Sequence, residues 1–513
     1  MAEYLSPAVF IEEVPSGAKP IQAVGTSVGA FVGHAQRGPL GVATLLHSYA
    51  EFVRLFGGPF DNGYLPLSVK AFFDEGGSSC WVVRTAHYTA PGTSAAVASE
   101  HTFENVTSAT DALTVSAASP GEWGDALAVE VELVAPDRFT LVVRQAGVEV
   151  ERIDGLSMDP FSPDYAPLAV GQRSALIRVE DKIPSGSTLS IADRRPQATA
   201  APEPLTGGDD GLSGLVVSDY IGDAAARTGL HALDEIDEVN IVAVPDAVDR
   251  QVHIEGMAWC QRRADCFYVA DAPESAVTAT ELLSYKRAQG VYSGGPAFNS
   301  KYGALYAPWI EVVDPRNGAA IGIPPSGAVM GRYARTDRTR GVHKAPAGVV
   351  DGRLASVIGL AARFGHADQE LLNPQGVNVI RHLPGAGHVI WGARTVSTDP
   401  EWRYLNVRRL FLFLEESIAE STSWTVFEPN DPSLWKSIER NIRAFLRLQW
   451  LAGALVGATE DEAFYVVCDE TTNPPESVRA GRVITEIGVA PSRPAEFVIF
   501  RIEQFEGGAA VTE

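Results

Sequence analysis

One short motif in the chain has the spacing of a catalytic nucleophile. Gly25-Thr-Ser-Val-Gly29 matches G-x-S-x-G, in which serine hydrolases hold their nucleophile on a strained turn between a strand and a helix. That chemistry also needs an acidic residue, a histidine and an oxyanion hole. Here the motif runs into Ala30-Phe-Val-Gly33, which has the pattern of a strand. We therefore interpret these small residues as packing within a strand, and a cytoplasmic serine hydrolase that uses Ser27 is the alternative function.

The remaining chemistry-bearing residues do not form a catalytic, cofactor or metal pattern. Leu383 to Gly392 and Leu205 to Gly211 are glycine-rich, but neither has the strand and helix context that a phosphate-binding loop needs. The ten histidines are scattered, and the four cysteines include no C-x-x-C pair. Asp209-Asp210 has the composition of an acid and base pair but reads as a surface loop. We expect no enzyme activity, no cofactor and no metal.

The most informative single element is a long helix predicted from Ser433 to about Leu455. Asp431-Pro432 opens it, with Asp as the N-cap and Pro at the first helical position. Its apolar stripe repeats at helical spacing and consists of Leu434, Ile438, Ile442, Phe445 and Leu446.

Four cations lie along one line of this helix, at steps of four, three and four residues. They are Lys436, Arg440, Arg443 and Arg447, and we call them the basic ridge. One interpretation is a solvated face that is partly paired through Glu439 to Arg443. The other is a contact surface for an acidic partner, because a basic ridge on an acidic protein selects such a partner.

Both ends of the chain have the pattern of apolar strands. Near the C-terminus, the run Pro494 to Glu506 is apolar on both faces in its first half, as in a strand that is covered on both sides. Near the N-terminus, Tyr4 to Pro15 alternates in the same way. The residues that define these strands are Val9, Phe10, Ile11, Phe497, Val498, Ile499, Phe500 and Ile502. Such strands on a large protein are expected to join another sheet.

Between these ends the composition and the hydrophobic pattern change several times along the chain. Residues 91–205 alternate weakly and contain Ala126 to Val134 and Phe139 to Arg144, typical of short antiparallel strands. Both flanks alternate apolar strands with helices, which favours a doubly wound sheet. We therefore predict an α/β core with an inserted β-rich domain, an α+β C-terminal domain, and extended N- and C-terminal strand arms. The predicted parts are residues 1–20, 21–90, 91–205, 206–387, 388–490 and 491–513.

Individual elements are predicted across these parts. The predicted helices are Tyr49–Phe56 with Ser48 as its cap, Leu65–Phe73, His253–Arg263, Ser326–Arg335 and Trp402–Ile418. The predicted core strands are Gly25–Gly33, Trp81–Arg84, Val239–Pro245, Phe267–Ala270 and Ala304–Val313.

The composition is that of a folded, acidic protein. The chain has 513 residues, of which 45% are hydrophobic and 20% are charged, and its formal net charge is −23. This balance argues against binding nucleic acid or an anionic membrane, because both need a basic face. The sequence lacks an apolar run of about 18 residues and the regions of a signal peptide. We expect a cytoplasmic protein without membrane insertion.

Several phrases of the sequence resemble one known family, the tail sheath proteins of contractile phage tails and phage-tail-like contractile injection systems. The resemblance spans most of the chain and is weakest in 90–150 and 160–200. The phrases include Tyr4-Leu-Ser-Pro-Ala-Val-Phe-Ile-Glu-Glu13, Ala30-Phe-Val-Gly-His-Ala-Gln-Arg-Gly-Pro39, Tyr333-Ala-Arg-Thr-Asp337, Trp424-Thr-Val-Phe-Glu-Pro-Asn-Asp431, Thr471-Thr-Asn-Pro474 and Pro494-Ala-Glu-Phe-Val-Ile-Phe-Arg501.

The resemblance implies a structural subunit that polymerises as stacked, hexameric rings around an inner tube and contracts to drive that tube through a target envelope. It implies that the two terminal arms add strands to sheets of neighbouring subunits. Residues 91–205 would then face outward, and residues 388–490 would face the tube with the basic ridge. The implied partners are other copies of the chain, the inner tube protein, and baseplate and terminal cap proteins. Assembly is expected in the cytoplasm of the producing bacterium.

Overall fold

The structure of the protein is a computed structural model that describes residues 19–107, 110–247, 249–497 and 499. It separates into two compact units. The larger unit consists of Ala23–Val342 and Pro346–Glu416. The smaller unit contains the described residues up to Gln22, the short segment His343–Ala345, and the described residues from Ser417 onward. This division falls within a helix near residue 416.

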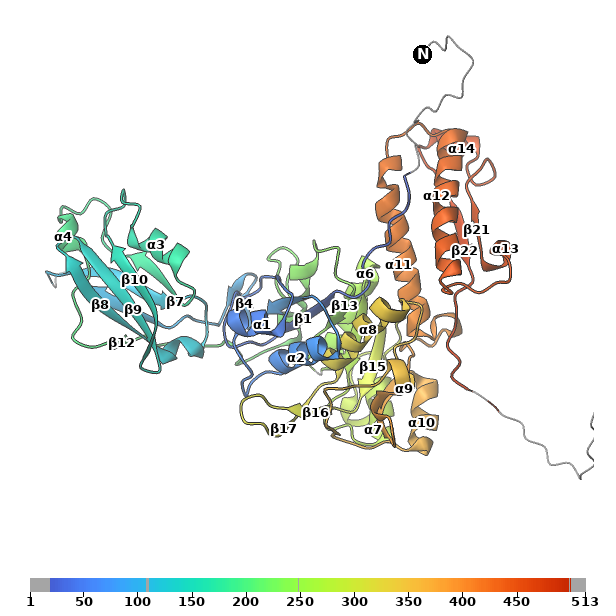
Figure 1. Cartoon of the computed structure of the whole chain (residues 1–513), viewed down its shortest axis with the longest axis horizontal. Coiled ribbons are helices and arrows are strands. Elements are labelled where there is room, and N and C mark those ends of the chain that lie inside the picture. The colour runs from blue at the N-terminus through green and yellow to red at the C-terminus, as the bar shows by residue number, and fades with distance from the viewer. Residues whose placement is uncertain (1–18, 108–109, 248, 498, 500–513) are drawn as a thin grey trace, which may run out of the picture. The chain divides into compact units, whose positions relative to one another are not determined.

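The larger unit is built around an eight-stranded sheet with the order β2-β3-β1-β13-β14-β15-β19-β20. Figure 1 labels β1, β13 and β15 of this sheet. The six central strands run parallel, and β2 and β20 are antiparallel at the two edges. Every residue of β1, β14 and β15 is buried, as expected for strands covered on both faces. The strands are β1 (Gly29–Gly33), β2 (Thr44–Leu46), β3 (Cys80–Arg84), β13 (Ile241–Ala243), β14 (Phe267–Asp271), β15 (Gly303–Ala307), β19 (Val377–Leu383) and β20 (Gly387–Ile390).

Helices cover both faces of this sheet. In the register of β14 and β15, Tyr268 lies opposite Gly303 and shares its face, and both approach helix α6. Tyr306, three residues after Gly303, faces the other side and contacts Tyr333 of helix α8. Outside the β-rich segment, the helices of this unit are α1 (Tyr49–Phe56), α2 (Leu65–Glu75), α5 (Val217–Ile221), α6 (Arg250–Arg263), α7 (Ala279–Arg287), α8 (Ser326–Arg340), α9 (Gly348–Asp351), α10 (His366–Leu372) and the first part of α11 (Leu405–Thr422). The expected α/β character is confirmed.

One predicted strand was wrong in its length. Ala304–Val313 was expected to be continuous, but β15 ends at Ala307 and β16 (Ile310–Val313) belongs to a separate antiparallel sheet with β17 (Ala320–Ile323) and β18 (Gly359–Leu360). Pro308 lies at the break, where it removes the N–H that a central strand would donate. The Trp309 indole also turns back and donates to the carbonyl of Ala272 at 2.8 Å.

The β-rich segment lies between β3 and β13, which belong to the same core sheet. Two of its sheets, β10-β9-β8-β12 and β11-β7-β6, share one hydrophobic core that includes Val115, Val129 and Leu141. Its elements are β4 (Tyr88–Ala90), β5 (Thr93–Ser94), β6 (Glu100–Glu104), β7 (Asp111–Ala117), β8 (Leu127–Ala135), β9 (Arg138–Gln145), β10 (Val148–Leu156), β11 (Ile177–Asp181), β12 (Glu203–Pro204), α3 (Ala166–Arg173) and α4 (Ile191–Arg194).

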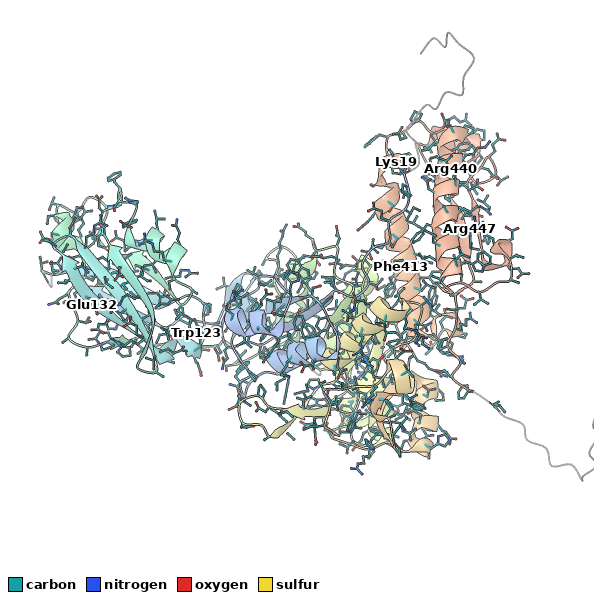
Figure 2. The ribbon with its side chains drawn as sticks, in the orientation of Figure 1. Lys19, Trp123, Glu132, Phe413, Arg440 and Arg447 are labelled. Carbon is teal, nitrogen blue, oxygen red and sulfur yellow. The ribbon has the colours of Figure 1, made fainter. Side chains whose placement is uncertain are left out.

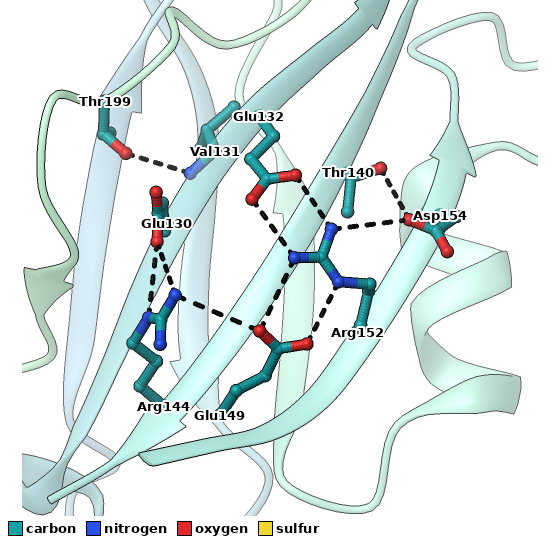
Figure 3. Close-up of polar contacts among 9 residues, drawn as sticks. All are labelled: Glu130, Val131, Glu132, Thr140, Arg144, Glu149, Arg152, Asp154 and Thr199. Carbon is teal, nitrogen blue, oxygen red and sulfur yellow. Dashed lines mark hydrogen bonds and ion pairs between the residues drawn. The ribbon is translucent and has the colours of Figure 1, made fainter. Parts of the chain in front are cut away.

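A charged network covers the outer face of β8, β9 and β10 (Figure 3). The Arg152 guanidinium donates to both carboxylate oxygens of Glu132, at 2.8 and 3.2 Å, and to Glu149 at 3.0 Å. These bonds hold the pKa of the Glu132 carboxyl below its usual range. Arg144 pairs with Glu130 on the neighbouring strands. Such cross-strand pairs keep an exposed sheet face soluble.

The smaller unit combines two long helices with a two-stranded sheet. Helix α11 enters it at Ser417, and helix α12 follows. The other elements of this unit are α12 (Pro432–Leu451), α13 (Glu460–Ala463), α14 (Pro475–Arg479), β21 (Phe464–Val467) and β22 (Glu486–Val489).

Candidate interaction surfaces

Helix α12 forms as its sequence predicts. The Asp431 carboxylate accepts hydrogen bonds from the N–H groups of Ser433 and Leu434, both at 2.9 Å, which satisfies two donors at the helix start. The helix ends at Leu451, four residues earlier than expected. Its predicted apolar stripe is buried, together with Trp435 and Asn441.

The basic ridge lies on the opposite side of this helix. Lys436, Arg440 and Arg447 are exposed and Arg443 is partly buried. Figure 2 shows Arg440 and Arg447 on α12. With Glu439, Ala444 and Glu460, the four cations line an open groove of about 470 Å³.

The ridge is only partly neutralised. The Arg443 guanidinium is 3.1 Å from a Glu460 oxygen and 3.8 Å from Asp461, and Arg447 is 3.8 Å from Glu460. The sequence suggested Glu439 as the partner of Arg443, but both carboxylates near Arg443 come from α13. Within the described residues, Lys436 and Arg440 form no ion pair. Because exposed pairs contribute only about 0–1 kcal/mol, Arg443 can exchange partners readily.

A small sheet packs beside α12. β21 and β22 pair antiparallel, with Phe464 opposite Val489 and Tyr465 opposite Gly488. Phe464 and Val466 are buried, whereas Tyr465 is exposed on the other face. In the described chain this sheet has two strands, so each strand has one unpaired edge. The sequence reasoning missed it, although the run Phe464-Tyr-Val-Val467 has strand-forming residues.

The predicted C-terminal strand begins just after this sheet. Pro491 bridges to Leu455, and the described residues after it, Ser492–Phe497 and Ile499, lie in no strand. The side chains of Phe497 and Ile499 are 74% and 80% exposed. The other predicted arm residues, Val9, Phe10, Ile11, Val498, Phe500 and Ile502, lie outside the described residues.

The N-terminal segment is fixed to α11 where its description begins. The Lys19 ammonium lies 4.1 Å from the centre of the Trp424 ring, a cation–π contact. The Gln22 N–H donates to the Ser421 hydroxyl at 3.0 Å. Figure 2 shows Lys19 beside α11. Lys19 and Gln22 therefore belong to the smaller unit.

The serine motif leads directly into the buried strand β1. β1 begins at Gly29, where an added Cβ would lie 3.1 Å from the Phe72 ring, so a larger residue would crowd that ring. A nucleophile elbow requires a helix directly after the motif, but the strand β1 follows instead. The Ser27 hydroxyl forms no hydrogen bond within the described chain. Its neighbour Thr26 instead donates to Asp337 at 2.9 Å.

None of the four cysteines has the exposure of a reactive thiol. All four cysteines are free and buried, and burial raises the pKa of the Cys80, Cys266 and Cys468 thiols. Across residues 19–107, 110–247, 249–497 and 499, no cluster of three or more His, Cys, Asp or Glu residues has the arrangement of a metal site. In the same residues, every helix is too short or too polar to cross a membrane.

Comparisons with known proteins match two adjacent family models and several relatives. The phage tail sheath protein central domain matches residues 216–396, and the phage tail sheath C-terminal domain matches residues 397–505. The tail sheath protein of Enterobacteria phage T4 is 25% identical over 261 residues, which cover 49% of this chain and 38% of that protein. The tail sheath protein of Escherichia phage P2 is 26% identical over 336 residues, covering 62% of this chain and 79% of the P2 protein.

A solved structure shares the fold over nearly the whole chain. The sheath complex of the extracellular contractile injection system PVC, in its contracted state, has a TM-score of 0.61 at 21% identity and covers 98% of this chain and 99% of the other. The matched relatives are structural tail sheath proteins and not enzymes, so the serine hydrolase alternative is not supported. Since the two models together cover more than half of its residues, the chain belongs to the phage tail sheath family.

Proposed function

We propose that this chain is the subunit of a contractile sheath, which polymerises as stacked rings around an inner tube and contracts to drive the tube through a target envelope. The observation that carries the proposal is membership of the tail sheath family. The likeness to a sheath solved in a contracted state supports it. Contraction is then a change between two packings of the same folded subunits, which needs no nucleotide at this chain.

Strand exchange would connect the subunits. The C-terminal arm, with Phe497, Val498, Ile499, Phe500 and Ile502, would add to the β21–β22 sheet of a neighbouring subunit, and so would the N-terminal arm. Support comes from the exposure of Phe497 and Ile499 and from the unpaired edges of β21 and β22. An added strand binds through main-chain hydrogen bonds and side-chain pockets. It would also extend a sheet that has two strands in the described part of the chain.

The basic ridge would contact an acidic surface of the inner tube in the extended sheath. Lys436 and Arg440 support this role because they are exposed and form no ion pair in the described chain. Arg443 and Arg447 would exchange Glu460 for carboxylates of the tube. Such contacts between surface charges weaken as salt rises, because the Debye length falls to about 3 Å at 1 M.

Each part of the chain would have its own position in the particle. Residues 21–90 and 206–387 form the core of each subunit, 91–205 face outward, and 388–490 face the tube. Residues 1–20 and 491–513 are the arms. The particle is a phage tail or tail-like device that is assembled in the bacterial cytoplasm, and baseplate and terminal cap proteins bind the ends of the sheath.

Electron microscopy tests the proposal directly. The chain is produced together with the tube protein of the same particle and purified without denaturant. We expect striated tubes with stacked rings around a central tube. A preparation that stays monomeric at high protein concentration, with and without the tube protein, would contradict the proposed function.

A further inference from the structure

The loop between α11 and α12 presents a fixed apolar projection. Val426 and Phe427, here called the knob, are exposed, and the Phe427 side chain is fully exposed. The Phe427 backbone has a φ of 71°, a left-handed conformation that is rare for a bulky residue. Such conformations persist where the surrounding structure determines them, and they concentrate at functional sites.

Hydrogen bonds on both sides of the knob hold this loop in place. The Glu428 N–H donates to the Thr425 carbonyl at 3.1 Å. The Asn430 side chain accepts from the Trp435 indole at 2.8 Å and donates to the Arg482 carbonyl at 2.9 Å. The knob is therefore presented in a fixed orientation, which lowers the entropy cost of binding.

A second apolar surface lies at the other end of α12. Leu448 and Leu451, one turn apart, are 63% and 68% exposed. The Trp450 indole donates to the Gly457 carbonyl at 3.0 Å, which holds exposed Val456 beside this last turn. We call the side chains of Leu448, Leu451 and Val456 the end patch. The 20 residues of α12 separate it from the knob by roughly 30 Å, so one molecule cannot close the contact on itself.

We propose that the knob of one subunit packs against the end patch of a second copy of this chain. A second copy is the occupant because proteins that share this fold were solved as sheath assemblies, in which many copies of one chain meet. Two different surfaces at opposite ends of one unit make a heterologous contact, which continues from copy to copy in rings or helical filaments. The inference rests on the proposed function and adds a direct contact between the smaller units of successive subunits.

The contact supplements the other contacts of a sheath. A single aromatic side chain buries about 150–250 Å², far below the roughly 1,200–2,000 Å² of a stable interface. The knob would therefore set the register between copies that are already connected, and would not assemble them by itself.

Paired cysteines test the proposal. The native cysteines are buried, so Phe427→Cys and Leu451→Cys introduce the accessible thiols. Assembled sheath is treated with a short bismaleimide, which tolerates gaps that a disulfide does not, and is then denatured. We expect a ladder of covalent oligomers from the double variant and its absence from each single variant and from unassembled protein.

Each other outcome contradicts the inference in a distinct way. Tubes without a ladder mean that the two surfaces do not meet, while the proposed function stands. Dimers from Phe427→Cys alone mean that the knob meets its own counterpart. A Phe427→Cys thiol that is protected in the unassembled monomer is covered by its own chain. Failure of the parent protein to build tubes contradicts the proposed function itself.

A second variant separates folding from contact. Phe427→Gly relieves the left-handed backbone, so the monomer is expected to unfold at the same or a higher temperature. It also removes the knob, so the sheath is expected to be shorter or irregular in electron micrographs. Phe161→Gly is the matched control, because Phe161 is also almost fully exposed but lies in the β-rich segment. Equal sheath length in both variants would overturn the proposal.

Discussion

The Arg409 guanidinium and the Asp337 carboxylate form an ion pair in which both side chains are almost completely buried, at 2.5 Å. Arg409 belongs to α11 and Asp337 to α8. Thr26 completes the arrangement, because its hydroxyl donates to Asp337 and its carbonyl accepts from Arg409 at 2.8 Å. The first half of α11 is thereby fixed to helix α8 and to the segment that precedes β1.

Removing the carboxylate from this pair is expected to destabilise the larger unit strongly. Asp337→Ala leaves the Arg409 charge buried without its counter-ion, which typically costs about 3–5 kcal/mol. The measurement is urea denaturation of the monomer, followed by tryptophan fluorescence. Asp61→Ala is the control, because Asp61 pairs with Arg316 at the exposed surface, where pairs contribute about 0–1 kcal/mol. Similar losses of unfolding free energy in both variants would show that the buried Arg409–Asp337 pair contributes no more than the exposed pair.

Asp271 makes the stability of the core depend on pH. It is fully buried at the end of β14 and accepts from the Ser326 N–H at 2.8 Å. Burial raises the pKa of its carboxyl to about 7, and the hydrogen bonds from Ser326 limit the rise. Since the unfolded value is about 3.9, the folded state binds the proton more tightly, and this term lowers the free energy of unfolding as pH rises from about 4 to 7.

His253 has the opposite dependence. Burial lowers the pKa of its imidazole to about 3, so the stability from its neutral form is lost as pH falls below about 6.5. The two groups therefore oppose each other between roughly pH 4 and 6.5. Of these two groups, only Asp271 still changes the free energy of unfolding between about pH 6.5 and 7.

Asp271→Asn separates these two terms. Its amide oxygen can still accept from Ser326, but it does not ionise. We expect the variant to be more stable than the parent at pH 8, with the difference shrinking toward pH 4, in urea denaturation series. Asp461→Asn, at a 91% exposed side chain, is the control. A difference from the parent that is the same at pH 5 and pH 8 would contradict the raised pKa.

The sequence predicted what depends on neighbours along the chain. Asp431 as a cap and the line of Lys436 to Arg447 follow from helical spacing alone, and both occur in the structure. Glu460 as a partner of Arg443 depends on how α13 packs beside α12, which spacing along one helix cannot reveal. The motif around Ser27 drew attention to the wrong hydroxyl for the same reason, since the partners of Thr26 lie in α8 and α11.

Charge reversal tests the proposed role of the basic ridge. Lys436→Glu with Arg440→Glu is expected to leave the monomer folded, because both side chains are exposed, and to prevent extended sheath from forming on the tube. The measurements are thermal unfolding and negative-stain microscopy. The matched control reverses Arg262 and Arg353, two exposed arginines of the larger unit, with the same change in net charge. Normal extended particles from the ridge variant would identify the ridge as a solvated face.

Deleting Phe497 to Phe505 tests the C-terminal arm. The exposed side chains of Phe497 and Ile499 contribute nothing to a core, so their removal is expected to leave the unfolding temperature of the monomer unchanged. Because the arm would supply a strand to the β21–β22 sheet of a neighbour, the shortened protein is expected to remain monomeric in analytical ultracentrifugation. Removing only Gly507 to Glu513 is the control, since that segment follows the apolar run. A synthetic peptide of the arm should bind the shortened monomer, which has open sheet edges but no arm of its own. Tubes that form without the arm would show that other contacts connect the lattice.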